Sequence, residues 1–171
     1  METFRSSFER GIGSTEGSGS VPGSKMSDGS GEQEKFIAVA RQLHALIPPA
    51  SEKIDMRVSA THAVQTSVIT AEDQEGNRQS LQGSDEVDDA VDDLRAAMYN
   101  PGSGTWFSAA LTVTAAGKAD ASYDYDDEPT WPFPVDPQIY ATDLQAFPRD
   151  DAHVPEWLRQ KVRDHEAGKT E

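Results

Sequence analysis

Cysteine is absent from the 171 residues of the chain. Its absence excludes disulfide bonds, thiolate zinc sites and cysteine nucleophiles. No apolar run approaches the ~20 residues that a membrane-spanning helix needs. The amino-terminal segment also lacks the apolar core of a signal peptide. We therefore expect a cytoplasmic protein that makes no contact with membranes.

Positive charge is scarce in the chain. Lys and Arg total 15 against 30 Asp and Glu, which gives a formal net charge of −15. A nucleic-acid-binding protein needs a basic footprint, so nucleic acid is not an expected partner. The charge favours a cationic partner instead. A general bias toward solubility is the alternative explanation of this acidity.

Motifs for catalysis and for metal binding are missing as well. The four histidines, His44, His62, His153 and His165, show no metal-ligand spacing. The chain has no Gly-x-Ser-x-Gly motif, no Walker motif and no dinucleotide fingerprint. We therefore expect no enzyme activity, no catalytic residues, no cofactor and no dedicated metal site. Weak, opportunistic calcium binding by residues 124–128 is the remaining metal hypothesis.

The chain is expected to hold one folded domain between two tails. Residues 1–34 are rich in Gly and Ser and have few apolar side chains. Such a segment cannot bury enough surface to offset the entropy of ordering, so it is predicted to be disordered. The domain is predicted to span residues 35–166, and residues 167–171 are predicted to be a flexible tail.

Apolar periodicity predicts the elements of this domain. The predicted helices cover residues 32–47, 85–98, 139–147 and 156–165. The predicted strands cover residues 54–60, 64–70, 79–82, 106–113 and 119–125. Hairpin-linked strands with helices at the ends favour an α+β fold. We expect an antiparallel sheet of four to five strands, built from two hairpins, with the helices packed on one face.

The second hairpin carries the most informative pattern. Ala119, Ala121, Tyr123 and Tyr125 alternate with polar residues, mostly aspartates, so one face of the strand is apolar and the other is acidic. Gly117 supplies the backbone freedom that a tight turn before this strand needs. The acidic face, together with the acids that follow it, is where we place the candidate site.

Two neighbouring features extend this acidic face. The predicted helix 85–98 is acidic on its outer side, and its acids combined with those of residues 120–128 predict one continuous negative patch. Trp131 and Phe133 lie in a proline-rich loop, where they are candidate exposed anchors for a partner. Aromatic anchors flanked by acids are typical of a surface that binds a basic protein.

Several motifs of the chain match a known pattern. Trp106 leads an alternating strand, Gly117-Lys118 forms the turn, and Tyr123-Asp-Tyr-Asp-Asp127 ends the second strand. These motifs resemble those of the YezG-like immunity proteins (antitoxins) of bacterial polymorphic toxin systems. The resemblance covers roughly residues 34–160, and its specificity lies in residues 104–128. Ala119 departs from it, because family members often place an aromatic residue there.

The resemblance implies tight binding rather than catalysis. Family members neutralise a cognate toxin, often a nuclease, inside the producing cell. A nuclease presents a basic cleft to phosphate, and a carboxylate-rich surface occupies such a cleft as a nucleic-acid mimic. The residues expected to contact the toxin are Asp120, Asp124, Asp126, Asp127, Glu128, Asp88, Asp89, Asp92 and Trp131. The alternatives are an acidic adaptor or regulatory domain without a toxin partner, and an enzyme too divergent to recognise.

Overall fold

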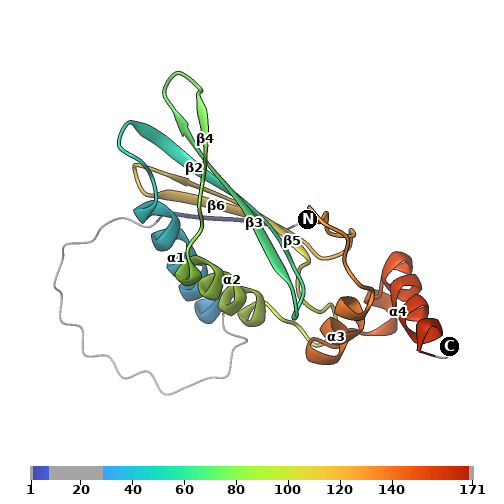
Figure 1. Cartoon of the computed structure of the whole chain (residues 1–171). Helices are drawn as coiled ribbons and strands as arrows, with labels where there is room; N and C mark the ends of the chain where they lie inside the picture. Colours follow the sequence, from blue (N-terminus) through green and yellow to red (C-terminus); the bar gives the residue numbers. More distant parts are fainter. Residues whose placement is uncertain (1, 8–28, 170–171) are drawn as a thin grey trace, which may run out of the picture.

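A computed structural model of the chain describes residues 2–7 and 29–169, which form a sheet with helices on one face and at one end (Figure 1). The helices are α1 (Gly29–Ala45), α2 (Asp85–Ala97), α3 (Gln138–Ala146), the 3-10 turn η1 (Asp151–His153) and α4 (Glu156–Gly168). The strands are β1 (Glu2–Ser7), β2 (Ser51–Ala60), β3 (Gln65–Asp73), β4 (Arg78–Leu81), β5 (Ser108–Thr114) and β6 (Lys118–Asp124).

The sheet is antiparallel and has the strand order β1-β6-β5-β2-β3-β4. Its centre consists of the hairpins β2–β3 and β5–β6, joined where β2 pairs with β5. Met56 on β2 lies opposite Ile69 on β3 and opposite Leu111 on β5, so the apolar residues of neighbouring strands fall into one row. The predicted α+β class, the antiparallel sheet and its two hairpins are confirmed.

The amino-terminal segment corrects one prediction. Residues 1–34 were expected to be disordered, but residues 2–7 form β1 and residues 29–34 belong to α1. β1 pairs with β6 along its length, from Glu2 opposite Tyr123 to Ser7 opposite Lys118, and it makes the sheet six-stranded. Without β1, β6 would be an edge strand with a row of unpaired backbone groups. The prediction for residues 8–28 lies outside the described residues.

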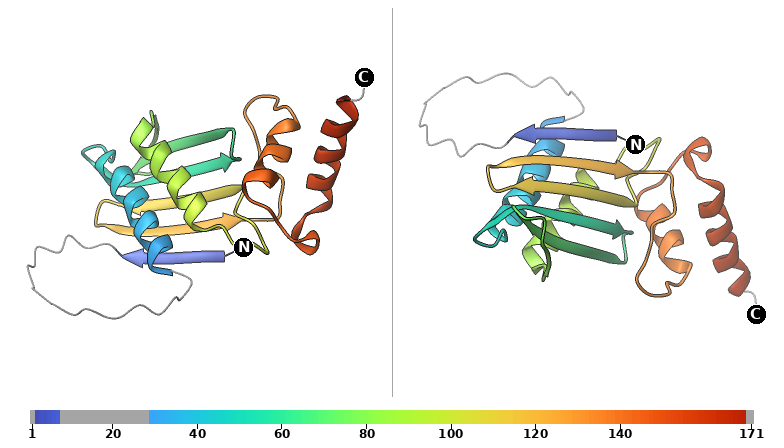
Figure 2. Two further views of the ribbon diagram at one scale, coloured as in Figure 1. Left: turned by 90° about the horizontal axis from the view of Figure 1, so that it is seen from below. Right: turned by 90° about the horizontal axis from the view of Figure 1, so that it is seen from above.

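The main core lies between the sheet and the helices α1 and α2, which cover one face (Figure 2). β6 places Ala119, Ala121 and Tyr123 on this face, all nearly inaccessible to solvent. α2 adds Val87 and Leu94 from one side of the helix, as its apolar periodicity predicts. The opposite face of the sheet, which we call the open face, is not covered by α1 or α2 (Figure 2).

The strand predicted at 64–70 is confirmed as β3, and the structure decides which of its two faces is buried. Ile69 is buried, whereas Val68 is 63% exposed. Both alternating sets of this strand contain apolar residues. A shift of the buried set by one residue would turn every side chain to the opposite face of the sheet. Val68 therefore lies on the open face.

A second, smaller core joins α3 and α4 to one end of the sheet. The alternation expected from Trp106 onward starts only at Ser108, where β5 begins. Trp106 belongs to the main core, whereas Phe107 packs with Tyr140 of α3 and Leu158 of α4. The two carboxyl-terminal helices thus lie beyond the strand ends rather than on the face that α1 and α2 cover (Figures 1 and 2). α4 continues to Gly168, so residues 167 and 168 are helical and not part of a flexible tail, and the prediction for residues 170–171 lies outside the described residues.

A buried ion pair ties the two cores together. Arg95 of α2 and Asp143 of α3 form a bidentate pair with N–O distances of 2.7 and 3.1 Å, and each side chain is 3% exposed. Arg95 also donates to the carbonyl of Trp106, and Asp143 accepts the backbone N–H of His62. The polar groups of the pair therefore have several partners, as burial of charge requires.

Candidate functional site

The acids that follow β6 are arranged around one turn. The Asp124 carboxylate accepts the backbone N–H groups of Asp126 and Asp127, each at 3.0 Å. These hydrogen bonds, chiefly that from Asp127, hold the pKa of Asp124 below its usual value. The negative charge of Asp124, and a side-chain hydrogen bond to it, raise the pKa of Asp127 in turn. Two interacting carboxylates thus stand side by side at the end of the strand.

This turn gives Asp124 a pH-dependent structural role. Because its folded-state pKa lies below that of the unfolded chain, its stabilising effect is present above the unfolded value of about 3.9 and is lost as the pH falls through the folded value. We expect carboxyl resonances in an NMR titration to place Asp124 below and Asp127 above the ordinary aspartate range. In Asp124→Asn, the pKa of Asp127 should fall. An unchanged Asp127 titration would contradict the interaction.

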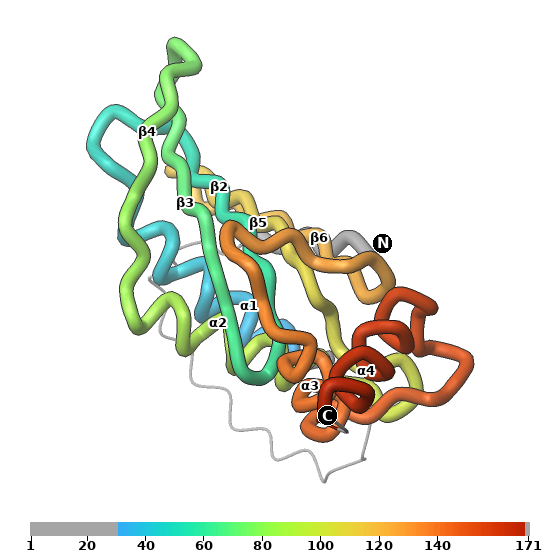
Figure 3. Tube along the Cα trace, turned by 45° about the vertical axis from the view of Figure 1, so that its right-hand side comes forward, coloured from blue at the N-terminus to red at the C-terminus, as the bar shows by residue number. Residues whose placement is uncertain are grey.

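From this turn, the segment between β6 and α3 crosses the open face of the sheet (Figure 3). We call residues 125–137 the crossing loop. Ser59 of β2 donates to the Thr130 carbonyl at 2.8 Å, and Trp131 donates through its indole N–H to the Tyr140 hydroxyl at 2.9 Å. The Trp157 indole N–H donates to the Asp126 carbonyl at 2.6 Å. The loop is therefore fixed to β2, α3 and α4.

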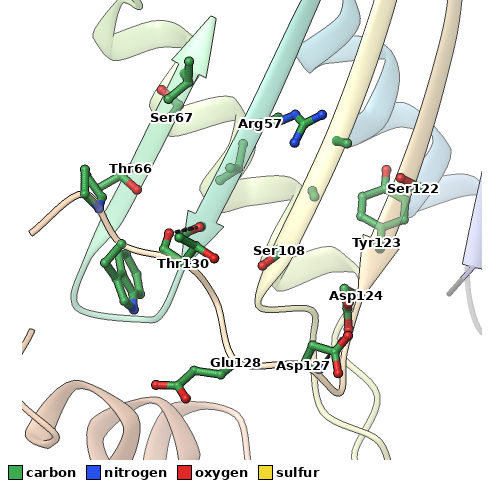
Figure 4. A pocket seen from close by; sticks show the side chains of 17 residues that line it. Arg57, Thr66, Ser67, Ser108, Ser122, Tyr123, Asp124, Asp127, Glu128 and Thr130 are labelled. Carbon is green, nitrogen blue, oxygen red and sulfur yellow. Dashed lines mark hydrogen bonds between the residues drawn. The ribbon is translucent and has the colours of Figure 1, made fainter.

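A groove of about 610 Å³ lies between the crossing loop and the open face (Figure 4). Its floor consists mainly of small side chains, with one basic and one branched apolar residue among them: Arg57, Ser59, Thr66, Val68, Ser108, Ala110 and Ser122. Asp124 lies beside this floor at the end of β6. The crossing loop forms its wall with Asp127, Glu128, Thr130, Trp131 and Pro132. Polar and apolar groups thus share one concave surface.

The acids predicted from β6 and its continuation lie on this side of the molecule. Asp120 is exposed and stands on the open face opposite Thr112, and Asp124 stands opposite Ser108 in the same register. Asp126, Asp127 and Glu128 are exposed on the crossing loop. Glu128 forms an ion pair with Lys161 of α4 at 3.0 Å, so part of its charge is compensated. The structure thus brings Asp124, Asp126, Asp127 and Glu128 together at the end of β6, whereas Asp120 lies four residues away along the strand on the same face.

The acids of α2 lie elsewhere. α2 packs against the covered face, so Asp88, Asp89 and Asp92 are exposed on the opposite side of the sheet from Asp120 and Asp124. Asp88 accepts a hydrogen bond from Gln65, and Lys35 of α1 pairs with Asp93 at 3.0 Å. The single continuous patch expected from the sequence is wrong because the sheet separates the two groups of acids.

Some aromatic residues near the acids are buried in the structure, and others are exposed to solvent. Trp131 is half-buried, and it both lines the groove and fixes the crossing loop. Phe133 is 47% exposed, and its ring centroid lies 6.4 Å from that of Trp131. Tyr123 is buried, and burial raises its pKa. Tyr123 thus packs in the main core and anchors β6 there.

The groove includes residues that the sequence reading did not single out. Arg57 is exposed on the open face, as the alternation of β2 indicates, since it lies between the buried Met56 and Val58. Val68 lies beside it on the same face, because it is the register partner of Arg57 on β3. The ion pair Arg95–Asp143 was also missed, although Arg95 follows Leu94 on the apolar stripe of its helix.

The described residues offer neither a metal cluster nor a membrane-spanning helix. Among residues 2–7 and 29–169, no group of three or more His, Asp or Glu side chains is placed to hold a metal ion. In that same part of the chain, none of the helices has the length and apolar character to cross a membrane. No protein-family model and no curated protein matches the chain.

Proposed function

We propose that the protein is an immunity protein that binds and neutralises a cognate protein toxin in the cytoplasm of the producing cell. The toxin is basic, and a nuclease fits this description best. One observation carries the proposal: Asp124, Asp127 and Glu128 line a groove at the end of β6, Asp126 is exposed in the same turn, and Asp120 lies farther along β6 on the same open face. The resemblance of residues 104–128 to the YezG-like immunity proteins supports the same function.

The arrangement suits a basic protein surface for electrostatic reasons. Asp126 and Asp127 are exposed, and the negative charge of Asp124 raises the pKa of Asp127. An approaching Lys or Arg relieves this repulsion between carboxylates, so it gains more than it would from one isolated acid. Clustered charge of one sign also steers a partner of opposite charge and raises its association rate.

The open-face acids, rather than those of α2, form the main contact in this proposal. The exposed hydrophobic residues Val68 and Phe133 and the groove are associated with the sheet face and its crossing loop. Binding surfaces of proteins combine such apolar groups with a charged rim. α2 presents acids to solvent, and its large apolar side chains Val87, Val91 and Leu94 are buried in the main core.

The function is tested by capture of the partner. The full chain, tagged at its carboxyl end, is expressed in its native cells and purified with whatever it binds. We expect a protein with a basic toxin domain, whose toxic or nuclease activity falls when the purified chain is added in equimolar amount. Capture of a non-toxic signalling protein alone would support the adaptor alternative instead.

Charge reversal on the crossing loop tests the acidic contact. In Asp126→Lys/Asp127→Lys, we expect association with the captured toxin to slow by about ten-fold or more at low salt, because steering by clustered charge is worth 10- to 1000-fold. Asp124 is left unchanged, since its carboxylate holds the turn. Association rates are measured by stopped-flow or surface plasmon resonance at two salt concentrations.

The matched control reverses an equal charge on the other side of the sheet. Asp89→Lys/Asp92→Lys adds the same charge on α2, and we expect a much smaller change in the association rate. Equal slowing by both variants would mean that net charge alone steers the partner. An unaffected rate in Asp126→Lys/Asp127→Lys would contradict the proposed contact.

A further inference from the structure

The groove on the open face is graded in character from one end to the other. The crossing loop runs across the strands, so its acids and its apolar residues stand beside different strands (Figure 4). Asp127 lies next to Asp124 at the end of β6. At the other end, Thr130 is bonded to Ser59 of β2, and Trp131 and Pro132 follow it in the groove wall. The wall therefore changes from acidic to apolar.

The floor changes in the same direction. One row of paired residues crosses the sheet from Val68 on β3, through Arg57 on β2 and Ala110 on β5, to Ser122 on β6. Val68, 63% exposed, stands at the apolar end of this row. Ala110 and Ser122 are small, so they leave room above β5 and β6.

We propose that the groove receives an extended segment of the basic partner, laid across the strands parallel to the crossing loop. A large apolar side chain of this segment contacts Val68 and Trp131, and a Lys or Arg reaches Asp124 and Asp127. The inference rests on the proposed function, because it takes the partner to be a basic protein. It goes further in naming the shape and the side chains of the segment that binds.

The spacing of the strands sets the spacing of the two side chains. Neighbouring strands lie about 4.8 Å apart, so three steps from β3 to β6 span about 14 Å. An extended chain rises about 3.3 Å per residue, so this span corresponds to about four residues. In an extended chain, residues four apart point to the same side. The apolar residue and the cation are therefore expected at positions i and i+4, in either order.

Arg57 restricts the residue between them. Its side chain is exposed on the floor between Val68 and Ala110 in the row, where the side chain at i+2 points. A second Lys or Arg at that position would meet a like charge, whereas an acidic or small polar residue would not. The groove therefore selects a segment in which a single cation stands at one end.

A peptide library tests the groove with the full chain. A phage library of random linear dodecapeptides is selected on the immobilised protein, and Ala110→Phe is used for counter-selection. Phe at position 110 fills the centre of the floor from an exposed position on β5. The matched control is Ala38→Phe, which adds the same side chain at an exposed position of α1. Circular dichroism verifies that both variants fold.

We expect the enriched peptides to share a large apolar residue four positions from a Lys or Arg. Synthetic copies should bind Ala110→Phe at least about ten-fold more weakly than the native chain, and bind Ala38→Phe with unchanged affinity. Asp127→Asn should weaken the same peptides. The inference is overturned if no sequence is enriched, if the enriched peptides lack this pattern, or if Ala110→Phe binds them as well as the native chain does.

The outcomes separate this inference from the proposed function. If Ala110→Phe captures and inhibits a basic toxin as well as the native chain does, the groove inference fails and the immunity function stands. If patterned peptides bind the groove but no toxin is captured or inhibited, the groove is a peptide site and the immunity function fails.

Discussion

Asp143→Ala is expected to lower the free energy of unfolding by about 3–5 kcal/mol, because it leaves the buried Arg95 guanidinium without its carboxylate partner. Both side chains of the pair are 3% exposed, so water cannot take the place of the carboxylate. The backbone N–H of His62 loses its acceptor in the same variant. The free energy of unfolding of a typical domain is about 5–15 kcal/mol, so this loss would be a large share of the total stability. Urea denaturation followed by circular dichroism measures it.

An exposed pair provides the control for this prediction. Lys35 and Asp93 lie at 3.0 Å, but their side chains are 41% and 63% exposed. Asp93→Ala should therefore cost less than about 1 kcal/mol. A double variant, Arg95→Met/Asp143→Leu, should recover only part of the lost stability, because the Trp106 carbonyl then lacks its Arg95 donor and the His62 N–H lacks its Asp143 acceptor. A cost for Asp143→Ala as small as that for Asp93→Ala would contradict the structural role of the buried pair.

Phe107→Ala is expected to destabilise the protein by about 3–5 kcal/mol, because it removes a fully buried ring and leaves a cavity. Phe107 lies at the centre of the second core, with its ring centroid 5.2 Å from that of Trp157 and 6.5 Å from that of Tyr140. The Arg149 guanidinium lies 4.7 Å above the same ring. Loss of the Phe107 ring should therefore destabilise the packing of α3 and α4 more than that of the sheet.

Hydrogen exchange and denaturation together check this expectation. Amide protection of α3 and α4 should fall in Phe107→Ala, while that of β2 and β5 should fall less. Phe133→Ala is the matched control, since its ring is 47% exposed and surface substitutions usually change stability by about 0.5 kcal/mol or less. Uniform loss of protection throughout the chain would show that the second core does not open on its own.

Local patterns predicted much of this fold. The apolar face of α2, the termination of α1 near Pro48 and the alternation of β6 depend on residues near in sequence, and each agrees with the structure. β1 was missed because composition averaged over a long Gly- and Ser-rich segment conceals six residues that pair with a strand far along the chain. Its backbone partners are set by the sheet edge and not by its own sequence.

The candidate site was predictable in part. The alternation of β6 suffices to put Asp120 and Asp124 on the same face, and the end of the strand at Asp124 brings the acids that follow it close to Asp124. The α2 acids are separated from the acids of β6 because α2 covers the other face of the sheet. The periodicity of a helix does not indicate which face of a sheet the helix covers. The groove depends on a loop that crosses several strands, held by contacts such as that between Ser59 and Thr130.

The two tryptophans that hydrogen-bond the crossing loop in place make its environment visible in the fluorescence of the protein. Of the three tryptophans in the chain, Trp106 is shielded in the main core, while Trp131 lines the groove and Trp157 holds the Asp126 carbonyl. A segment that occupies the apolar end of the groove changes the surroundings of the Trp131 ring, whereas Trp106 is buried away from the groove. The emission spectrum of the unlabelled chain therefore reports occupancy of the groove, and Trp131→Phe should abolish that signal.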